Sequence, residues 1–179
     1  EIRFCDWSSD VCSSDLEDAE IVFEAADPET AYAVDQIVWS SPPEQCDASI
    51  LRLTNPVTGI EPLPVAKSLP TLEATAQVYV VGHPGGRDLS FSFQDNKLLD
   101  HEGPPDGKPP IPGVCRVHYM APTEGGSSGS PVFNSTSWQV IALHHKGGKV
   151  GMPKLNGATG TYGANEGISI QSIVAFPKP

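Results

Sequence analysis

Proline and glycine interrupt this chain so often that a long helix cannot form in it. The 179 residues include 18 prolines and 17 glycines, and no stretch keeps the 3.6-residue spacing of an amphipathic helix. The apolar runs between them are short and rich in valine and isoleucine, which favours β-strands. Hydrophobic residues make up 39% of the sequence, which is enough for a core. We therefore expect an all-β fold.

Short strand-like segments follow one another from residue 19 to the end of the chain. The first two flank the turn-forming sequence ADPET. The segment LSFSFQDNKLLDHE is expected to form a hairpin with Asp95 and Asn96 at its tip. Strands separated by turns at this spacing predict a barrel or a sandwich. The segments with strand character are 19–25, 31–40, 47–53, 76–86, 89–102, 114–120, 137–148 and 157–176.

The first 16 residues, EIRFCDWSSDVCSSDL, differ from the rest of the chain. They show neither strand alternation nor helical periodicity, and they lack the basic start and apolar middle of a secretory signal peptide. They resemble translated sequencing-adapter DNA, and a disordered acidic N-terminus is the alternative. On the adapter interpretation, the native sequence begins near Glu17 and the lack of a signal peptide carries no meaning.

Charge and cysteine spacing argue against several classes of protein. The net charge is −11 and no lysine or arginine cluster could neutralise phosphates, so we expect no nucleic-acid partner. No apolar run approaches the roughly 18–20 residues needed to cross a bilayer. Cys46 and Cys115 lack the spacing of a zinc site, and we expect no metal and no cofactor. Whether these two cysteines form a disulfide stays open, because sequence does not set their distance.

The sequence GGSSGSPVF, residues 125–133, raises the question of a serine nucleophile. It fits the G-x-S-x-G elbow of α/β-hydrolases with Ser127 as nucleophile, and it fits a G-x-S-G-x-P pattern with Ser128 instead. A plain glycine–serine turn is a third interpretation. An elbow serine precedes a helix, whereas the PVF sequence here begins a strand. Ser128 is therefore the better nucleophile.

With Ser128 chosen, two segments together resemble the chymotrypsin-like, or trypsin-like, serine peptidases. They are TEGGSSGSPVFN (123–134) and the acid motif CDASILRL (46–53). GHPGG (82–86) and NEGISI (165–170) are similar to segments of the bacterial branch of that family. The resemblance implies a serine endopeptidase, with a peptide or protein as its substrate. We expect a monomer.

The resemblance also implies a domain organisation, namely two six-stranded β-barrels with the active site in the cleft between them. After the non-native leader 1–16, residues 17–66 would form a first barrel truncated at its N-terminus. Residues 67–179 would form the second barrel, with the serine loop and the specificity pocket. The cellular location stays unassigned: a bacterial protein, secreted or part of a larger multidomain protein.

The resemblance assigns catalytic roles to three residues. Ser128 would attack the scissile carbonyl, and the backbone N–H groups of Gly126 and Ser128 would form the oxyanion hole. A glycine suits this role, because a residue without Cβ can turn its N–H into the hole. Asp47 would orient the base histidine and stabilise its protonated form.

The base histidine itself is missing. In this fold it precedes the aspartate by roughly 45 residues, yet no histidine precedes His83. We expect that the gene was cut just after its histidine motif, so that this chain has little or no peptidase activity. A protease-like binding module that lost its base is the alternative. A serine esterase of the α/β-hydrolase type would require helices that this sequence does not indicate.

The primary pocket is predicted to favour glutamate before the cleaved bond. Thr123 before the serine, and His144 with Gly147 in ALHHKGG (142–148), are similar to the pocket of glutamyl endopeptidases. Imidazole and hydroxyl groups can donate to a carboxylate, and partial protonation near neutral pH would add charge assistance. His144 is chosen over His145 because side chains alternate along a strand. The alternative is that both histidines merely pack near the cleft.

Overall fold

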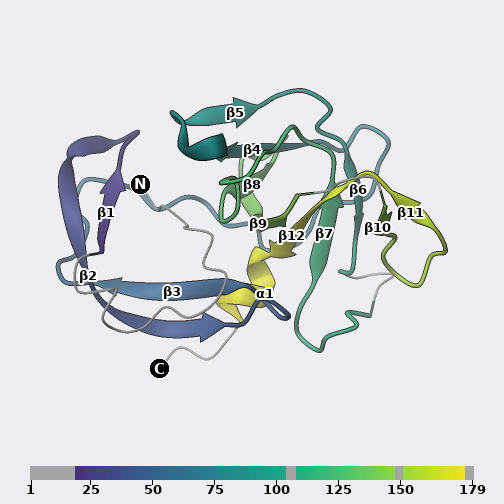
Figure 1. Ribbon diagram of the computed structural model, residues 1–179, viewed down its shortest axis with the longest axis horizontal. Coiled ribbons are helices and arrows are strands. Elements are labelled where there is room, and N and C mark those ends of the chain that lie inside the picture. The colour runs from purple at the N-terminus through teal and green to yellow at the C-terminus, as the bar shows by residue number, and fades with distance from the viewer. Residues whose placement is uncertain (1–18, 104–107, 148–150, 176–179) are drawn as a thin grey trace. The chain divides into compact units, whose positions relative to one another are not determined.

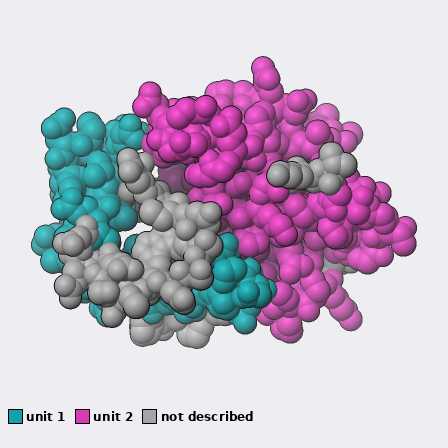
Figure 2. All heavy atoms as spheres, in the orientation of Figure 1, with its two compact units in different colours: residues 1–62, 179 teal, residues 63–178 magenta. Residues whose placement is uncertain are grey.

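The computed structural model describes residues 19–103, 108–147 and 151–175. The chain divides into two compact units, unit 1 with residues 1–62 and 179, and unit 2 with residues 63–178 (Figure 2). Twelve strands, one 3-10 turn and the five-residue helix α1 (Ile170–Val174) make up the regular structure of the described residues (Figure 1). The predicted all-β fold is confirmed. The predicted leader 1–16 lies outside the described residues, and the predicted domain boundaries stay a prediction.

Unit 1 contains a three-stranded antiparallel sheet in the order β1-β2-β3. Ile21 and Val34 are buried in its small core, with partly buried aromatic and aliphatic side chains around them. Its last strand begins directly after Asp47, so the predicted acid lies at a strand end. The strands are β1 (Glu20–Phe23), β2 (Asp27–Ser41) and β3 (Ala48–Leu53).

Unit 2 is built around a seven-stranded antiparallel sheet in the order β5-β4-β8-β9-β12-β7-β6. The sheet curls so that the edge strand β6 reaches β4. The Val78 N–H donates to the Asn96 carbonyl over 2.8 Å, and the Leu98 N–H donates to the Ala76 carbonyl over 2.9 Å. These bonds join the start of β4 to the start of β6 and close a barrel. The strands are β4 (Val78–Gly82), β5 (Ser90–Ser92), β6 (Leu98–His101), β7 (Arg116–Tyr119), β8 (Pro131–Asn134), β9 (Val140–Lys146) and β12 (Asn165–Ser169).

Four smaller elements complete the described part of unit 2. The 3-10 turn η2 (Pro84–Gly86) follows β4. The short strands β10 (Met152–Pro153) and β11 (Thr161–Tyr162) pair with each other in a separate two-stranded sheet. Helix α1 follows β12 directly at the end of the described chain.

The segment 89–102 does not form the predicted hairpin. Its first part, β5, pairs with β4, and its second part, β6, pairs with β7, so the segment passes from one neighbour to the next. Asn96, predicted at an exposed tip, is 4% exposed, and its side-chain amide donates to the carbonyls of Val78 and Ser92. Asp95 adopts a left-handed backbone with φ of 50°. The chain does bend at this turn-like sequence, but β5 and β6 pair with different strands and not with each other.

Apolar side chains from all sides of the barrel fill its interior. Those with no exposed surface are Val78, Val117, Tyr119, Val132, Ile141 and Ala142. Gly167 on β12 makes room for one of them, because a Cβ at this position would lie 3.3 Å from Cε1 of Tyr119 and 2.9 Å from the Leu143 carbonyl oxygen. The Tyr119 ring is therefore held in one place by the barrel itself.

Asn96→Ala is expected to destabilise the barrel. The change removes two amide hydrogen bonds from buried backbone carbonyls at the point where the barrel closes, which costs about 1–3 kcal/mol of unfolding free energy. Urea unfolding of the variant and of wild type measures the difference. The control is Gln94→Ala, an exposed amide on the same segment, for which a change within about 0.5 kcal/mol is expected. Equal stability of all three proteins would contradict the role given to Asn96.

Candidate active site

The serine loop, residues 123–130, connects β7 to β8 and is shaped by two glycines. Gly126 and Gly129 have φ values of 89° and 82°, which side-chain-bearing residues rarely adopt. The Ser127 N–H donates to the Glu124 carbonyl over 3.0 Å, which closes one turn. The Gly129 N–H donates to the His144 carbonyl over 2.7 Å and so joins the loop to β9. The loop is fixed both internally and to the neighbouring strand.

The two adjacent serines have different environments. Ser127 is 4% exposed, and its Oγ accepts a hydrogen bond from the Glu124 N–H over 3.2 Å. Ser128 is partly exposed. Strand β8 follows the loop directly, so the α/β-hydrolase elbow, which needs a helix there, does not fit. Ser127 supports the loop, and Ser128 is the serine that a ligand can reach.

The GHPGG turn (82–86) packs against the serine loop. The Gly85 N–H donates to the Gly125 carbonyl over 2.7 Å. Because the C=O and N–H of a trans peptide point in opposite directions, this bond turns the Gly126 N–H away from the GHPGG turn. A Cβ on Gly126 would lie 3.2 Å from Gly85 N and 3.3 Å from the His83 carbonyl oxygen, so glycine is required here on steric grounds as well.

The N–H groups of Gly126 and Ser128, predicted to form the oxyanion hole, share one property. Within the described ranges, no carbonyl or side chain accepts a hydrogen bond from either of them. Unpaired backbone donors beside an accessible hydroxyl are the arrangement that an oxyanion needs. Their role as an oxyanion hole stays a prediction.

His144 is 3% exposed, and its Nδ1 lies 2.7 Å from the hydroxyl of Tyr119. Burial, with the nearby charge of Glu166, raises the pKa of Tyr119 well above its usual value, so the hydroxyl keeps its proton. This hydrogen bond occupies Nδ1 and leaves Nε2 as the other ring nitrogen of His144. Sequence reasoning missed Tyr119, which looks like an ordinary core residue of β7.

His144 is neutral at neutral pH. Burial, together with the neighbouring His145, lowers its pKa to about 4. The expected partial protonation near neutral pH is therefore wrong for the unliganded protein. The physical reason is that the sequence shows the residue type but not the loss of water around the ring.

Thr123 contacts Asn165, a second residue that sequence reasoning missed. The Thr123 hydroxyl donates to Oδ1 of Asn165 over 3.1 Å, and the Asn165 amide donates to the Ala121 carbonyl over 2.7 Å. The signal for Asn165 was its place in the NEGISI motif, which was used only for its family resemblance. Gly147, the third predicted pocket residue, is exposed just after β9.

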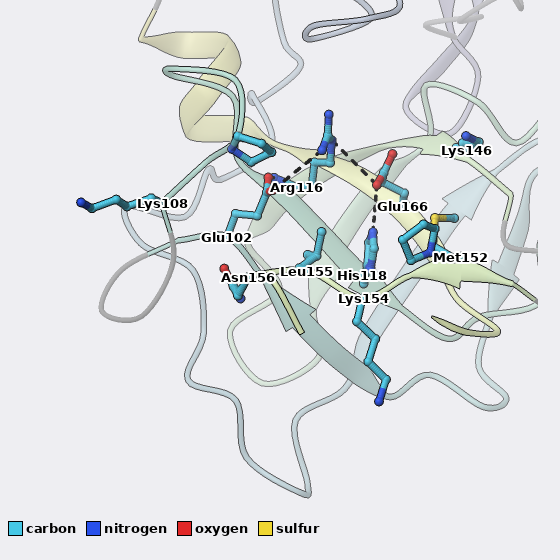
Figure 3. Close-up of a pocket in the computed structure, with 13 residues that line it drawn as sticks. Glu102, Lys108, Arg116, His118, Lys146, Met152, Lys154, Leu155, Asn156 and Glu166 are labelled. Atoms are coloured by element: carbon cyan, nitrogen blue, oxygen red, sulfur yellow. Dashed lines mark hydrogen bonds and ion pairs between the residues drawn. The ribbon is translucent and has the colours of Figure 1, made fainter. Parts of the chain in front are cut away.

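His145 lies in a different environment from His144. Its Nε2 is 3.6 Å from Oε1 of Glu166, whose Oε2 accepts a 2.8 Å hydrogen bond from Nε2 of His118. Arg116 lies between Glu166 and Glu102, at 3.9 and 3.8 Å (Figure 3). Burial alone would raise the pKa of Glu166, but His118 and then Arg116 hold it below its usual value. The two adjacent histidines therefore belong to separate networks.

A cavity of about 670 Å³ adjoins this ionic network. Arg116, His118 and Glu166 contribute to its wall, whereas none of the predicted site residues does (Figure 3). Beside it, the hydroxyl of Tyr162 lies 2.7 Å from Nδ1 of His118. Burial and the charges of Asp100 and Glu166 raise the pKa of Tyr162 to about 12, so it too remains a hydroxyl.

Asp47 belongs to unit 1, whereas the other predicted site residues belong to unit 2. It is exposed, with φ of 45°, and its N–H donates to the Pro42 carbonyl over 3.1 Å.

The two described cysteines do not form a disulfide: Cys46, next to Asp47, is buried, and both Cys46 and Cys115 are free thiols. Burial raises the pKa of Cys115 to about 11, which keeps that thiol protonated.

Two kinds of feature are absent from the described part of the chain. Within it, no group of three or more histidine, cysteine or acidic side chains is arranged to hold a metal ion. No helix there is long and apolar enough to cross a membrane.

Residues 8–143 match the sequence profile of the trypsin-like peptidase domain family. The chain belongs to this family. The match begins inside the segment 1–16, whose origin from adapter DNA stays a prediction. No curated protein matches the chain.

Two solved structures have a similar fold. One is the inactive form of the Rv3671c protease, with 18% identity and a TM-score of 0.53. The other is the inactive form of a serine-to-alanine mutant of Rv3671c from M. tuberculosis H37Rv, with 17% identity and a TM-score of 0.51. Each similarity covers 83% of this chain, which spans 66% and 65% of those chains. At this identity the likeness concerns the fold alone.

The buried neutral ring of His144 is expected to make stability depend on pH. Its pKa is about 4 when folded and about 6.5 when unfolded, so the unfolded chain binds more protons between these values. Stability is therefore lost as the pH falls from 6.5 to 4, by about 3 kcal/mol from this residue. Urea unfolding of wild type and His144→Gln across this range measures it. A variant that loses as much stability as wild type would contradict the buried neutral state.

Proposed function

We propose that this chain carries the nucleophile and the acid of a serine endopeptidase, Ser128 and Asp47. The observation that carries the proposal is a partly exposed Ser128 hydroxyl beside two backbone N–H groups that no described residue engages. Membership of a peptidase family implies protein substrates. The same combination is what acyl transfer requires: an accessible nucleophile and donors for the developing negative charge.

The reaction would proceed in two steps. The Ser128 oxygen attacks the scissile carbonyl while a base removes its proton, and the carbonyl oxygen becomes an oxyanion bound by the N–H groups of Gly126 and Ser128. The intermediate collapses, the C–N bond breaks, and the amine leaves with the proton from the base. Water then attacks the acyl-enzyme by the same route and releases the carboxylic acid. The GHPGG turn would keep the Gly126 N–H directed toward the oxyanion.

The base would be a histidine that this chain does not carry. No histidine precedes His83 in the sequence, and the family order places the base before the acid. Asp47 would accept a hydrogen bond from that histidine and stabilise its cation. Without a base, the Ser128 hydroxyl stays protonated and is a poor nucleophile. A protease-like binding module is the second candidate.

The primary pocket would bind the side chain of the residue before the cleaved bond, with glutamate as the proposed preference. His144 would donate from Nε2 to the substrate oxygen, because its Nδ1 faces the Tyr119 hydroxyl. The Thr123 hydroxyl, which donates to Asn165 in the unliganded protein, would turn to the substrate as the second polar group. A bound carboxylate raises the pKa of a neighbouring imidazole. Glutamate binding would therefore bring a proton onto His144.

The chain as printed is expected to have little or no peptidase activity. Adding an N-terminal segment that supplies the base histidine should restore hydrolysis, because loss of one triad member costs about 10⁴–10⁶ in turnover. Ser128→Ala should then abolish the restored activity, whereas the matched control Ser127→Ala should retain most of it. Release of a chromophore from a peptide substrate measures the rate. Hydrolysis that survives Ser128→Ala would show that the nucleophile is wrong, and peptide binding without hydrolysis would favour the binding module.

The restored enzyme is expected to prefer glutamate over glutamine by at least about tenfold in kcat/KM at about pH 5. The ratio is measured with peptides that differ only in Glu, Gln, Lys or Leu before the cleaved bond. Ionisation of the catalytic base affects the rates of all these peptides equally, so it cancels in the ratio. His144→Ala should remove the preference. The matched control is His145→Ala, which removes the neighbouring histidine of the other network and should leave the glutamate preference unchanged. A preference that persists in His144→Ala would contradict the pocket assignment.

A further inference from the structure

The cavity of about 670 Å³ beside the ionic network has no role in the proposed reaction. We propose that it is a binding site for a small organic dianion, a phosphate monoester or a dicarboxylate on an apolar body, held by Arg116 and three lysines. The inference goes beyond the proposed function and does not rest on it, because none of the predicted site residues lines the cavity.

The fold collects cationic side chains at this cavity from four separate places along the sequence. Of the 11 lysines and arginines in the chain, four line its wall, together with two acidic side chains. With His118 neutral, the wall carries a formal charge of +2 in a chain whose net charge is −11. A dianion is therefore the ligand that balances the charge of the cavity. The cations are Lys108, Arg116, Lys146 and Lys154, and the acids are Glu102 and Glu166.

The Arg116 guanidinium lies near two carboxylates without donating a hydrogen bond to either. Its Nη1 is 3.8 Å from Oε1 of Glu102, and its Nε is 3.9 Å from Oε2 of Glu166, both beyond the length of a hydrogen bond (Figure 3). The side chain of Arg116 is 27% exposed, so a ligand can reach it. A guanidinium presents its N–H donors as a planar fork that matches phosphate and carboxylate oxygens. Arg116 can therefore bind an anion through two parallel hydrogen bonds.

The two carboxylates have closer partners than this guanidinium. Oε2 of Glu102 accepts the backbone N–H of Arg116 over 2.8 Å, and Oε2 of Glu166 accepts a 2.8 Å bond from Nε2 of His118. Both acidic residues are buried, with exposed fractions of 2% and 9%. An anion bound to the guanidinium would leave both of these hydrogen bonds in place.

The three lysines of the wall are available to a ligand. Lys108, Lys146 and Lys154 are exposed, and among the described residues no acidic side chain lies within ion-pair distance of any of them. They lie on different sides of the ionic network in the view of Figure 3. A lysine ammonium is a point charge on a flexible stem, so it can move to an anion that Arg116 has already oriented.

Part of the wall is apolar, which favours an organic anion over inorganic phosphate. Met152 and Leu155 are 8% and 6% exposed, and Pro110 and Pro153 also line the cavity. A ligand with an apolar body would bury surface against these side chains. The volume lies within the range of roughly 300–1,000 Å³ that is typical of small-molecule sites.

The test uses the 179-residue chain at about pH 8, where a phosphate monoester carries close to two charges. Calorimetry at one ionic strength compares two organic dianions, phenyl phosphate and phthalate, with inorganic phosphate and with uncharged benzyl alcohol. We expect the better organic dianion to bind with a Kd of about 1 mM or less, at least about fivefold more tightly than inorganic phosphate. Benzyl alcohol should not bind.

The outcomes of this comparison are distinct. Tighter binding of phenyl phosphate or of phthalate identifies phosphate or carboxylate as the recognised group. Failure of both at about 10 mM would overturn the inference, and so would equal binding of benzyl alcohol. Inorganic phosphate that binds as tightly as the organic dianions would contradict the apolar part of the site.

Lys146→Gln and Lys154→Gln test the site without disturbing the barrel, because both side chains are exposed. Each change removes one cation near the ligand and should weaken binding of the better organic dianion by about threefold, and the double variant by about tenfold. The matched controls are Lys67→Gln and Lys97→Gln, which remove the same charge from exposed lysines outside the cavity. They should leave the Kd unchanged. Equal weakening by the controls would show that overall charge attracts the anion, and it would overturn the site.

A spectroscopic measurement reports on the place of binding directly. In nitrogen-15 NMR of the arginine side chains, the Nε signal of Arg116 should shift when the better organic dianion saturates the protein. The signal of Arg87, which pairs with Glu124 at 2.8 Å outside the cavity, should stay where it is. A saturated protein with an unshifted Arg116 signal would overturn the inference without any variant being made.

Discussion

Two backbone hydrogen bonds between the serine loop and β9 hold the functional part of unit 2 together. The Gly129 N–H donates to the His144 carbonyl over 2.7 Å, and the His144 N–H donates to the Ser130 carbonyl over 2.8 Å. The loop that presents Ser128 and the strand that presents His144 are therefore one rigid ladder. Both bonds depend on the left-handed backbone of Gly129, with φ of 82°, which turns the chain from the loop into β8. The proposed nucleophile and the proposed pocket histidine are thus held close enough to act on neighbouring groups of one substrate.

Two adjacent histidines on β9 belong to two different networks, because successive side chains of a strand point to opposite faces. His144 bonds to the buried hydroxyl of Tyr119, and His145 contacts the carboxylate of Glu166. Glu166 is in turn held ionised by His118 and Arg116. The Glu166 network is therefore separate from His144. Burial, and then the neighbouring His145, keep His144 neutral.

The family match assigns this chain to the trypsin-like peptidase domains, and the two solved structures share its fold. The barrel of unit 2 contains everything that the proposed oxyanion hole and pocket require, whereas the proposed acid, Asp47, comes from unit 1. The family order requires a base upstream of that acid. The proposed chemistry of Ser128 therefore draws on both units, whereas the proposed pocket residues all belong to unit 2.

The sequence by itself determined the all-β class, the strand order along the chain and the identity of the accessible serine. Frequent prolines and glycines exclude long helices, and the PVF sequence after Ser128 favours a strand, which β8 confirms, so these conclusions follow from local rules. Local rules failed at Asn96, where a turn-like sequence is buried by pairing between β4 and β6. They also could not reveal Tyr119 or Asn165, because each matters through a partner at least 25 residues away. The charge state of His144 was decided by the tertiary structure alone, since the pKa of an imidazole depends on the water and charges that packing removes or brings near.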